Sequence, residues 1–152
     1  MIFFPIDELS RTCKGAALNF VKNHEPICVQ LAGTIKKSTQ NVYVCFANDI
    51  LPKNIYGILS LRKTILYCLP FTNAEKITAL QKDFSISLSD FYLTEKLEPP
   101  LCVNGTKSGS SLILQSIERL YGKPSHTNEY QLMQLDIKSF RKISPIPFYE
   151  NE

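Results

Sequence analysis

Leu101–Leu114 reads LCVNGTKSGSSLIL, in which a short apolar run is followed by Gly, Ser, Thr and Lys and then by apolar residues at helical spacing. This order predicts a strand, a glycine-containing turn and the start of a helix. The backbone N–H groups in the first turn of a helix lack intrahelical acceptors, and the helix dipole adds partial positive charge there. The stretch is therefore a candidate anion site.

The candidate site has six consecutive residues: Gly105, Thr106, Lys107, Ser108, Gly109 and Ser110. Backbone N–H groups from Gly109 onward would hold a phosphate or pyrophosphate, and Lys107 would add a full positive charge. The spacing matches neither the P-loop, G-x-x-x-x-G-K-[ST], nor the dinucleotide fingerprint, G-x-G-x-x-G. The alternative is a structural turn, in which Ser108 or Ser110 caps the helix and the glycines supply unusual dihedral angles.

Composition predicts an ordinary globular protein with one folded domain. Of the 152 residues, 44% are hydrophobic and 20% are charged, which is enough apolar material for a core. The net charge is only +3 and basic residues occur in short doublets, so we expect no nucleic acid partner. The chain has neither an apolar run of about 18 residues nor the pattern of a signal peptide. We therefore expect no membrane association and a cytoplasmic location.

The cysteines and histidines predict no catalytic or metal site. The five cysteines are widely spaced among apolar neighbours and form no C-x-x-C pair, which favours buried, reduced thiols over disulfides or zinc. A thiolate at the start of the helix is conceivable at Cys102, but its apolar flanks favour a buried strand cysteine. His24 and His126 lie in loop-like segments without a spaced carboxylate partner, so we expect both to be exposed and inert.

The apolar spacing predicts a helix over residues 8–23. For residues 85–100 the pattern does not decide between a strand, a helix and a packed loop. Thr72–Glu75 has the form of a capping box and predicts a second helix, with Ile77, Leu80 and Phe84 on its apolar face. A third helix ends at Gly122. Strands are predicted at residues 27–33, 42–46, 55–61, 64–69, 101–103 and 130–135. This order predicts an α/β (α+β) domain over residues 1–137, with helices on both faces of a mixed, largely antiparallel sheet, and a linker-like tail over 138–152.

The order of helix, antiparallel strands, helix, strand, glycine turn, helix and strand resembles the GNAT acyltransferase superfamily. Two local stretches, residues 55–70 and 130–136, look like the amino-terminal half of bacterial two-part GNAT proteins. The resemblance covers about residues 8–137. It implies acetyl-CoA as the cofactor, with residues 105–110 holding its pyrophosphate, and no metal.

The superfamily's cofactor motif, [QR]-x-x-G-x-[GA], is absent, because Thr106 lies three residues before Gly109 and Ser111 lies two residues after it. The chain also offers no catalytic glutamate or tyrosine that the motif could assign. The resemblance thus implies a non-catalytic amino-terminal domain that supports or completes the binding cleft of a downstream catalytic domain. The alternatives are a stand-alone acetyl-CoA-dependent N-acyltransferase and a small protein-interaction or regulatory module. We expect the partner to be this downstream domain or a second copy of the chain.

Overall fold

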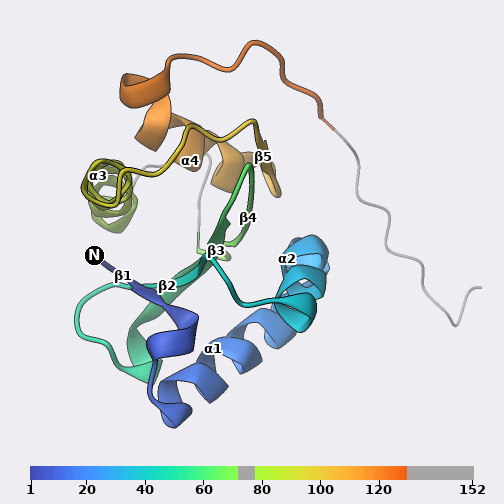
Figure 1. Ribbon diagram of the computed structural model, residues 1–152, viewed down its shortest axis with the longest axis vertical. Helices are drawn as coiled ribbons and strands as arrows, with labels where there is room; N and C mark the ends of the chain where they lie inside the picture. Colours follow the sequence, from blue (N-terminus) through green and yellow to red (C-terminus); the bar gives the residue numbers. More distant parts are fainter. Residues whose placement is uncertain (72–77, 130–152) are drawn as a thin grey trace, which may run out of the picture.

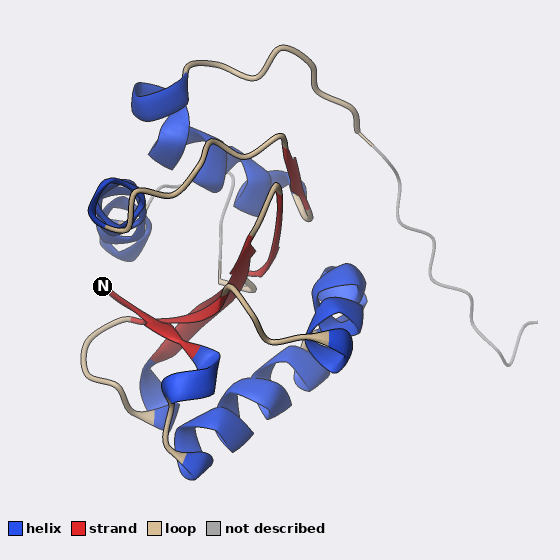
Figure 2. Ribbon diagram, in the orientation of Figure 1, coloured by secondary structure: helices blue, strands red, loops and turns tan. Residues whose placement is uncertain are grey.

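The computed structural model describes residues 1–71 and 78–129, in which the chain forms one sheet with helices on either side (Figures 1 and 2). The strands are β1 (Ile2–Pro5), β2 (Val42–Phe46), β3 (Ile55–Leu61), β4 (Thr64–Cys68) and β5 (Cys102–Asn104). The α-helices are α1 (Arg11–Asn23), α2 (Glu25–Lys37), α3 (Ala79–Thr94) and α4 (Lys107–Tyr121), and the short 3₁₀ helices are η1 (Ile6–Glu8) and η2 (Pro52–Asn54).

The five strands lie in the order β1-β2-β3-β4-β5. The first three pairings are antiparallel, whereas β5 runs parallel to β4. The parallel pairing is short: Thr64 lies opposite Cys102, and Leu66 lies opposite Asn104. Past Leu66, β4 continues through Tyr67 and Cys68, whereas the segment that follows β5 turns into α4. The predicted mixed, largely antiparallel sheet is confirmed.

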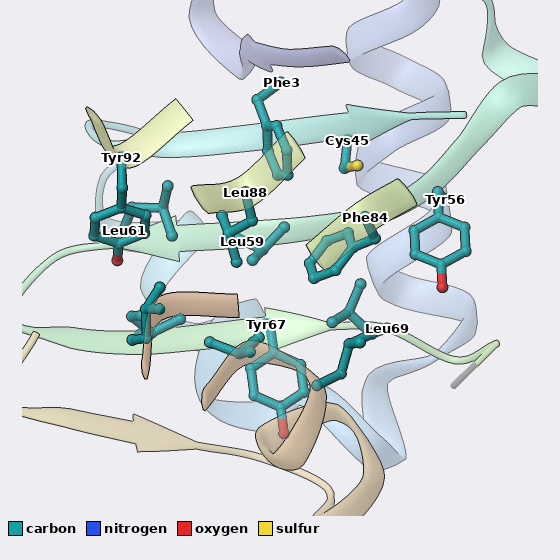
Figure 3. Close-up of a cluster of buried hydrophobic side chains, with 14 residues drawn as sticks. Phe3, Cys45, Tyr56, Leu59, Leu61, Tyr67, Leu69, Phe84, Leu88 and Tyr92 are labelled. Carbon is teal, nitrogen blue, oxygen red and sulfur yellow. The ribbon is translucent and has the colours of Figure 1, made fainter. Parts of the chain in front are cut away.

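Helices cover both faces of the sheet, as predicted. On one face, α1 and α2 bury side chains such as Ala17 and Leu31 against Val44 and Ile58 of the central strands. On the other face, α3 and α4 contribute Phe84, Leu88, Tyr92, Leu112, Ile113 and Ile117 to a second core with Leu59, Ile65 and Tyr67 (Figure 3). Burial on both faces explains why every residue of β3 is buried.

The strand predicted over residues 27–33 is wrong, because this segment is part of α2. Pro26 reads as a stop signal in sequence, but it lies in the first turn of α2, where a proline without an N–H costs nothing. The buried residues Cys28, Leu31 and Ala32 have the spacing of one helical face. The β-branched Ile27 and Val29, which favour a strand by propensity, lie on the exposed side.

The segment after residue 85, for which the sequence does not decide between strand, helix and packed loop, is helical as far as Thr94, where α3 ends. Its buried residues Phe84, Leu88 and Tyr92 recur every four positions. The cap of α3 is Thr78, whose hydroxyl accepts from the backbone N–H of Gln81 while the Gln81 side chain accepts from the N–H of Thr78. The capping box predicted at residues 72–75 lies outside the described residues, as do the strand predicted at 130–135 and the tail.

The other predicted elements are confirmed within a few residues. The helix predicted over 8–23 is α1, preceded by η1, and the strands predicted over 55–61 and 64–69 are β3 and β4. Gly122 ends α4 with a φ of 81°, a value that favours glycine. The strand β1 was not expected from the sequence.

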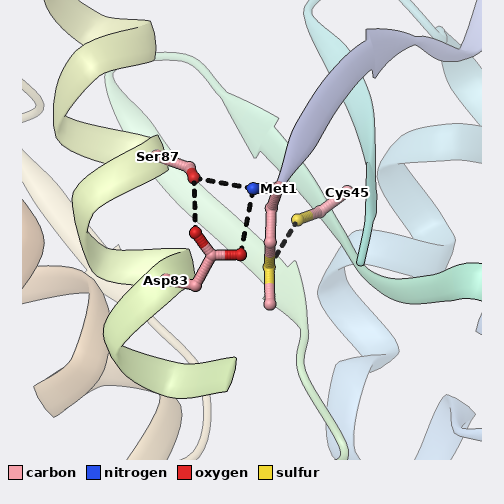
Figure 4. A network of polar contacts seen from close by, with 4 residues as sticks. All are labelled: Met1, Cys45, Asp83 and Ser87. Atoms are coloured by element: carbon pink, nitrogen blue, oxygen red, sulfur yellow. Dashed lines mark hydrogen bonds and ion pairs between the residues drawn. The ribbon is translucent and has the colours of Figure 1, made fainter. Parts of the chain in front are cut away.

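The amino terminus is held against α3 on the side of the sheet that α4 also covers (Figure 4). The Met1 ammonium donates to Asp83 Oδ2 at 3.1 Å and to Ser87 Oγ at 2.9 Å. The Cys45 thiol points at Met1 Sδ, 3.6 Å away. These contacts join Met1, the residue before the edge strand β1, to α3 and to Cys45 of β2.

Candidate functional site

The candidate anion site lies at the turn from β5 into α4. Gly105 follows the strand, Thr106 is the N-cap residue, and Lys107 through Ser110 form the first helical turn. The first intrahelical bond runs from the N–H of Ser110 to the carbonyl of Thr106, at 2.8 Å. Neither Ser108 nor Ser110 is the N-cap residue, and the Thr106 side chain makes no capping hydrogen bond. The prediction of a serine cap is therefore wrong, because the helix begins one residue before Ser108.

Tyr67 of β4 fills the inner side of this turn. A Cβ atom added to Gly105 would lie 2.4 Å from Tyr67 Cζ, and one added to Gly109 would lie 2.4 Å from Tyr67 Cε2. Side-chain atoms do not approach so closely, so both positions require glycine while the ring is there. The absence of a side chain explains these two glycines better than unusual dihedral angles, since neither has a positive φ.

The Tyr67 hydroxyl completes the contact. It donates to the Thr106 carbonyl at 2.6 Å and is 2.8 Å from Ser110 Oγ. Burial raises the pKa of Tyr67 above its usual value, and the hydrogen bonds at Ser110 and Thr106 offset part of that rise. The phenol is thus neutral near pH 7. Its hydrogen bonds connect β4 to the start of α4. In Figure 3 the ring extends from β4 beneath the core of this face.

The one lysine of the candidate site has an acidic partner. Lys107 Nζ lies 2.7 Å from Glu129 Oε1, and both side chains are largely exposed. A phosphate at the turn would meet the Glu129 carboxylate as well as the lysine, and like charges repel. Gly109, which was expected to present its N–H to the anion, is buried. The turn keeps the dipole of a helix N-terminus, but aromatic packing occupies its inner side.

A hydrogen bond from the residue before this turn reaches α2, which covers the other face of the sheet. Asn104 Nδ2, at the end of β5, donates to Gln30 Oε1 of α2 at 2.8 Å. The candidate site is thus a β5–α4 turn that is hydrogen-bonded to Tyr67 of β4 and, through Asn104, to Gln30 of α2.

The histidines and cysteines considered in the sequence form no second candidate site among the described residues. His24 is half-buried between the rings of Phe20 and Phe71, and its Nδ1 donates to the Phe20 carbonyl at 2.8 Å. It is therefore less exposed than expected, whereas His126 is exposed. Cys102 is exposed, which corrects the prediction of a buried strand thiol; it lies on an edge strand of the described sheet. The other four cysteines are buried as predicted.

Sequence reasoning missed Tyr67, which is the residue that decides the shape of the turn. Its contact with residues 105–110 joins positions about 40 apart in sequence, and no local pattern marks such a contact. Within residues 1–71 and 78–129, no group of three or more His, Cys, Asp or Glu side chains is arranged to hold a metal ion. None of the helices described in the same ranges is long and apolar enough to cross a membrane.

No family model, curated protein or solved structure matches the chain.

Proposed function

We propose that this chain is a GNAT-like domain that transfers no acyl group itself and supports, or completes the binding cleft of, a catalytic acyltransferase domain. The observation that carries the proposal is the packing of Tyr67 into the β5–α4 turn. The glycines that suggested a pyrophosphate site are accounted for by an aromatic ring. A turn filled in this way has a structural role and needs no ligand.

The order of elements supports the fold-level part of the proposal. After β1, a helical segment, three antiparallel strands, a helix, a strand, a glycine-containing turn and a further helix follow one another, as in the resemblance drawn from the sequence. The resemblance concerns architecture, and architecture alone does not determine chemistry. The absence of the superfamily's cofactor motif in the sequence supports the non-catalytic part.

Calorimetric titration with acetyl-CoA tests the non-catalytic part. We expect no saturable heat with the unmodified chain and none with Lys107→Glu. This variant removes the exposed positive charge of the turn without touching Tyr67. A variant of Gly109 would be uninformative, because any side chain there meets the Tyr67 ring. Saturable binding that Lys107→Glu weakens about tenfold or more, together with acetylation of an added amine, would overturn the proposal.

The supporting role is tested by joining this chain to the catalytic domain that we expect its native gene to encode next to it. We expect kcat/KM of the two domains together to exceed that of the catalytic domain alone by about tenfold or more, which corresponds to about 1.4 kcal/mol of transition-state stabilisation. Equal kcat/KM values would contradict the proposal, as would a native gene without such a domain.

A further inference from the structure

Two basic doublets that are far apart in sequence meet at one end of the sheet. One doublet ends α2, and the other lies between β3 and β4. Arg62 joins the two segments: its Nη2 donates to the Gln40 carbonyl at 2.7 Å and to Ser38 Oγ at 3.3 Å, and its Nε donates to the same carbonyl at 3.2 Å. Ser38 directly follows α2, so the doublets are neighbours. The basic patch consists of Lys36, Lys37, Arg62 and Lys63.

The positive charge of the basic patch is largely uncompensated. All four of its residues are exposed. Over residues 1–71 and 78–129, only Lys36 of the patch has an acidic partner, Glu25 Oε1, at 3.9 Å. The groups that accept from Arg62 are neutral, so the guanidinium keeps its full charge. The helix dipole favours lysines at the end of α2, but it does not explain the second doublet, which lies between two strands.

The backbone beneath the basic patch is held by hydrogen bonds to neighbouring segments. The N–H of Leu61 donates to the Asn41 carbonyl at 2.9 Å, and the Lys63 carbonyl accepts from the N–H of Leu101 at 2.7 Å. The Arg62 side chain is held as well, by the bonds given above. Charged groups that are already positioned lose less conformational freedom when a ligand binds. The patch is therefore a prepared surface for an anionic partner.

The composition of the basic patch favours carboxylates over nucleic acid. Residues 36–40 read KKSTQ and residues 62–64 read RKT, so neither segment has an aromatic side chain on which a base could stack. Four cations without base contacts give nucleic acid only weak, salt-sensitive binding. An arginine guanidinium, by contrast, pairs with a carboxylate through two parallel hydrogen bonds.

Acidic side chains of the chain itself limit the extent of the positive surface. Glu25 lies beside Lys36, and Asp7 accepts from Thr39 Oγ1 at 2.7 Å and pairs with Lys14 at 3.1 Å. A long phosphate backbone that continued past the patch would meet these carboxylates, and like charges repel. A short acidic peptide contacts the four cations without extending beyond them.

We propose that the basic patch is a docking surface for a short acidic segment of a partner protein. Asp or Glu carboxylates of that segment pair with the Arg62 guanidinium and with the three lysine ammonium groups. Such pairing is electrostatic, so it directs the partner to this end of the sheet and weakens as salt screens the charges. The partner surface lies outside the β5–α4 turn and is independent of any ligand there.

Fluorescence anisotropy with a labelled hexaglutamate peptide tests the docking surface. The titration is made at about 0.1 M ionic strength, where charges more than about 10 Å apart are largely screened. We expect saturable binding to the unmodified chain with a Kd below about 1 mM, weakened about tenfold or more by Lys37→Glu together with Lys63→Glu. These changes leave Arg62 and its hydrogen bonds in place.

A milder pair of changes keeps the test valid if the reversed charges prevent folding. Glutamate in the last turn of α2 opposes the helix dipole, whereas glutamine does not. Lys37→Gln together with Lys63→Gln should weaken peptide binding about threefold or more. Circular dichroism checks that each variant keeps the helical content of the unmodified chain.

The matched control removes the same charge elsewhere. Lys53 lies in η2, which precedes the opposite end of β3, and Lys82 lies in α3, on the other face of the sheet; both are exposed. Lys53→Glu together with Lys82→Glu should bind the peptide within about twofold of the unmodified chain.

Three results would contradict the docking surface. The first is no saturable binding of hexaglutamate to the unmodified chain. The second is equal weakening in the control and in the patch variant, because net charge alone would then attract the peptide. The third is an oligouridylate with six phosphates that binds more tightly than hexaglutamate and loses binding in the patch variant, which would assign the patch to nucleic acid.

Discussion

At the scale of single residues, the ring of Tyr67 governs the β5–α4 turn. It excludes side chains at Gly105 and Gly109, and its partly buried hydroxyl gives the Thr106 carbonyl a second donor beside the Ser110 N–H. Buried polar groups cost little when they are paired and much when one partner is removed. The steric and the polar contributions of this ring can therefore be measured separately.

The steric contribution is tested by Gly109→Ala. We expect a loss of about 1–3 kcal/mol in the free energy of unfolding, because the new methyl group overlaps Tyr67. Gly33→Ala is the matched control: Gly33 lies in α2, a Cβ there meets nothing within 4 Å, and alanine should stabilise by about 0.5–1 kcal/mol. Urea denaturation measures both values. A loss at Gly109 that persists in the Tyr67→Ala background would contradict the steric explanation.

The polar contribution is tested by comparing two tyrosines. Tyr67→Phe should cost about 1 kcal/mol, because the Thr106 carbonyl loses one of its two donors and Ser110 Oγ loses its contact with the hydroxyl. The hydroxyl of Tyr56 is buried and has no hydrogen-bond partner among the described residues. Tyr56→Phe should therefore leave stability near pH 7 unchanged or raise it slightly. Equal losses in the two variants, measured by urea denaturation, would argue against the hydrogen bond of Tyr67.

At the scale of elements, sequence patterns identified helices and strands where side-chain spacing was regular. The strands at residues 42–46, 55–61 and 64–69 are predictable because β-formers dominate them. The α2 segment was misassigned because the β-branched Ile27 and Val29 and the position of Pro26 outweighed the helical spacing of the buried residues. Propensity is a weak guide where tertiary packing selects the buried face.

The capping box of α3 gives an element-scale prediction. Thr78→Ala removes the acceptor for the Gln81 N–H and should cost about 1 kcal/mol. The matched control is Thr106→Ala at the N-cap of α4, where the side chain makes no capping hydrogen bond and the change should stay within about 0.5 kcal/mol. Thermal unfolding followed by circular dichroism compares the two. A larger loss for Thr106→Ala would mean that the Thr78 cap does not stabilise α3 as inferred.

At the scale of the whole molecule, the position of the candidate site in the chain could be predicted from sequence. The side chains from other elements that contact it could not. The pattern of residues 101–114 correctly placed a strand, a turn and a helix start. The Tyr67 contact and the Glu129 partner of Lys107 both depend on how distant segments pack. A local pattern carries no information about which side chain fills a turn from another strand.

Alkaline titration gives a whole-molecule prediction. Burial raises the pKa of Tyr56 to about 12 and that of the Cys45 thiol to about 12, from ordinary values of 10.0 and 9.0. Between the ordinary and the raised values the unfolded chain has released protons that the folded chain keeps. These two groups should therefore leave the free energy of unfolding unchanged between about pH 7 and 9 and lower it as the pH rises toward about 12.

Urea denaturation across this pH range checks the alkaline prediction, and Tyr56→Phe is the control that should fall less steeply because one of the titrating groups is gone. A free energy of unfolding that stays flat to about pH 12 would contradict the burial of these groups.

The contact of the Met1 ammonium with Asp83 and Ser87 has a practical consequence for protein production. An affinity tag or fusion partner on the amino side replaces this charged group by a neutral peptide bond and forces extra chain into the space between β1 and α3. A tag on the carboxyl side leaves this contact intact. Preparations that differ only in the side of the tag should therefore differ in yield and in resistance to proteolysis, and the measurements proposed above call for carboxyl-tagged or untagged protein.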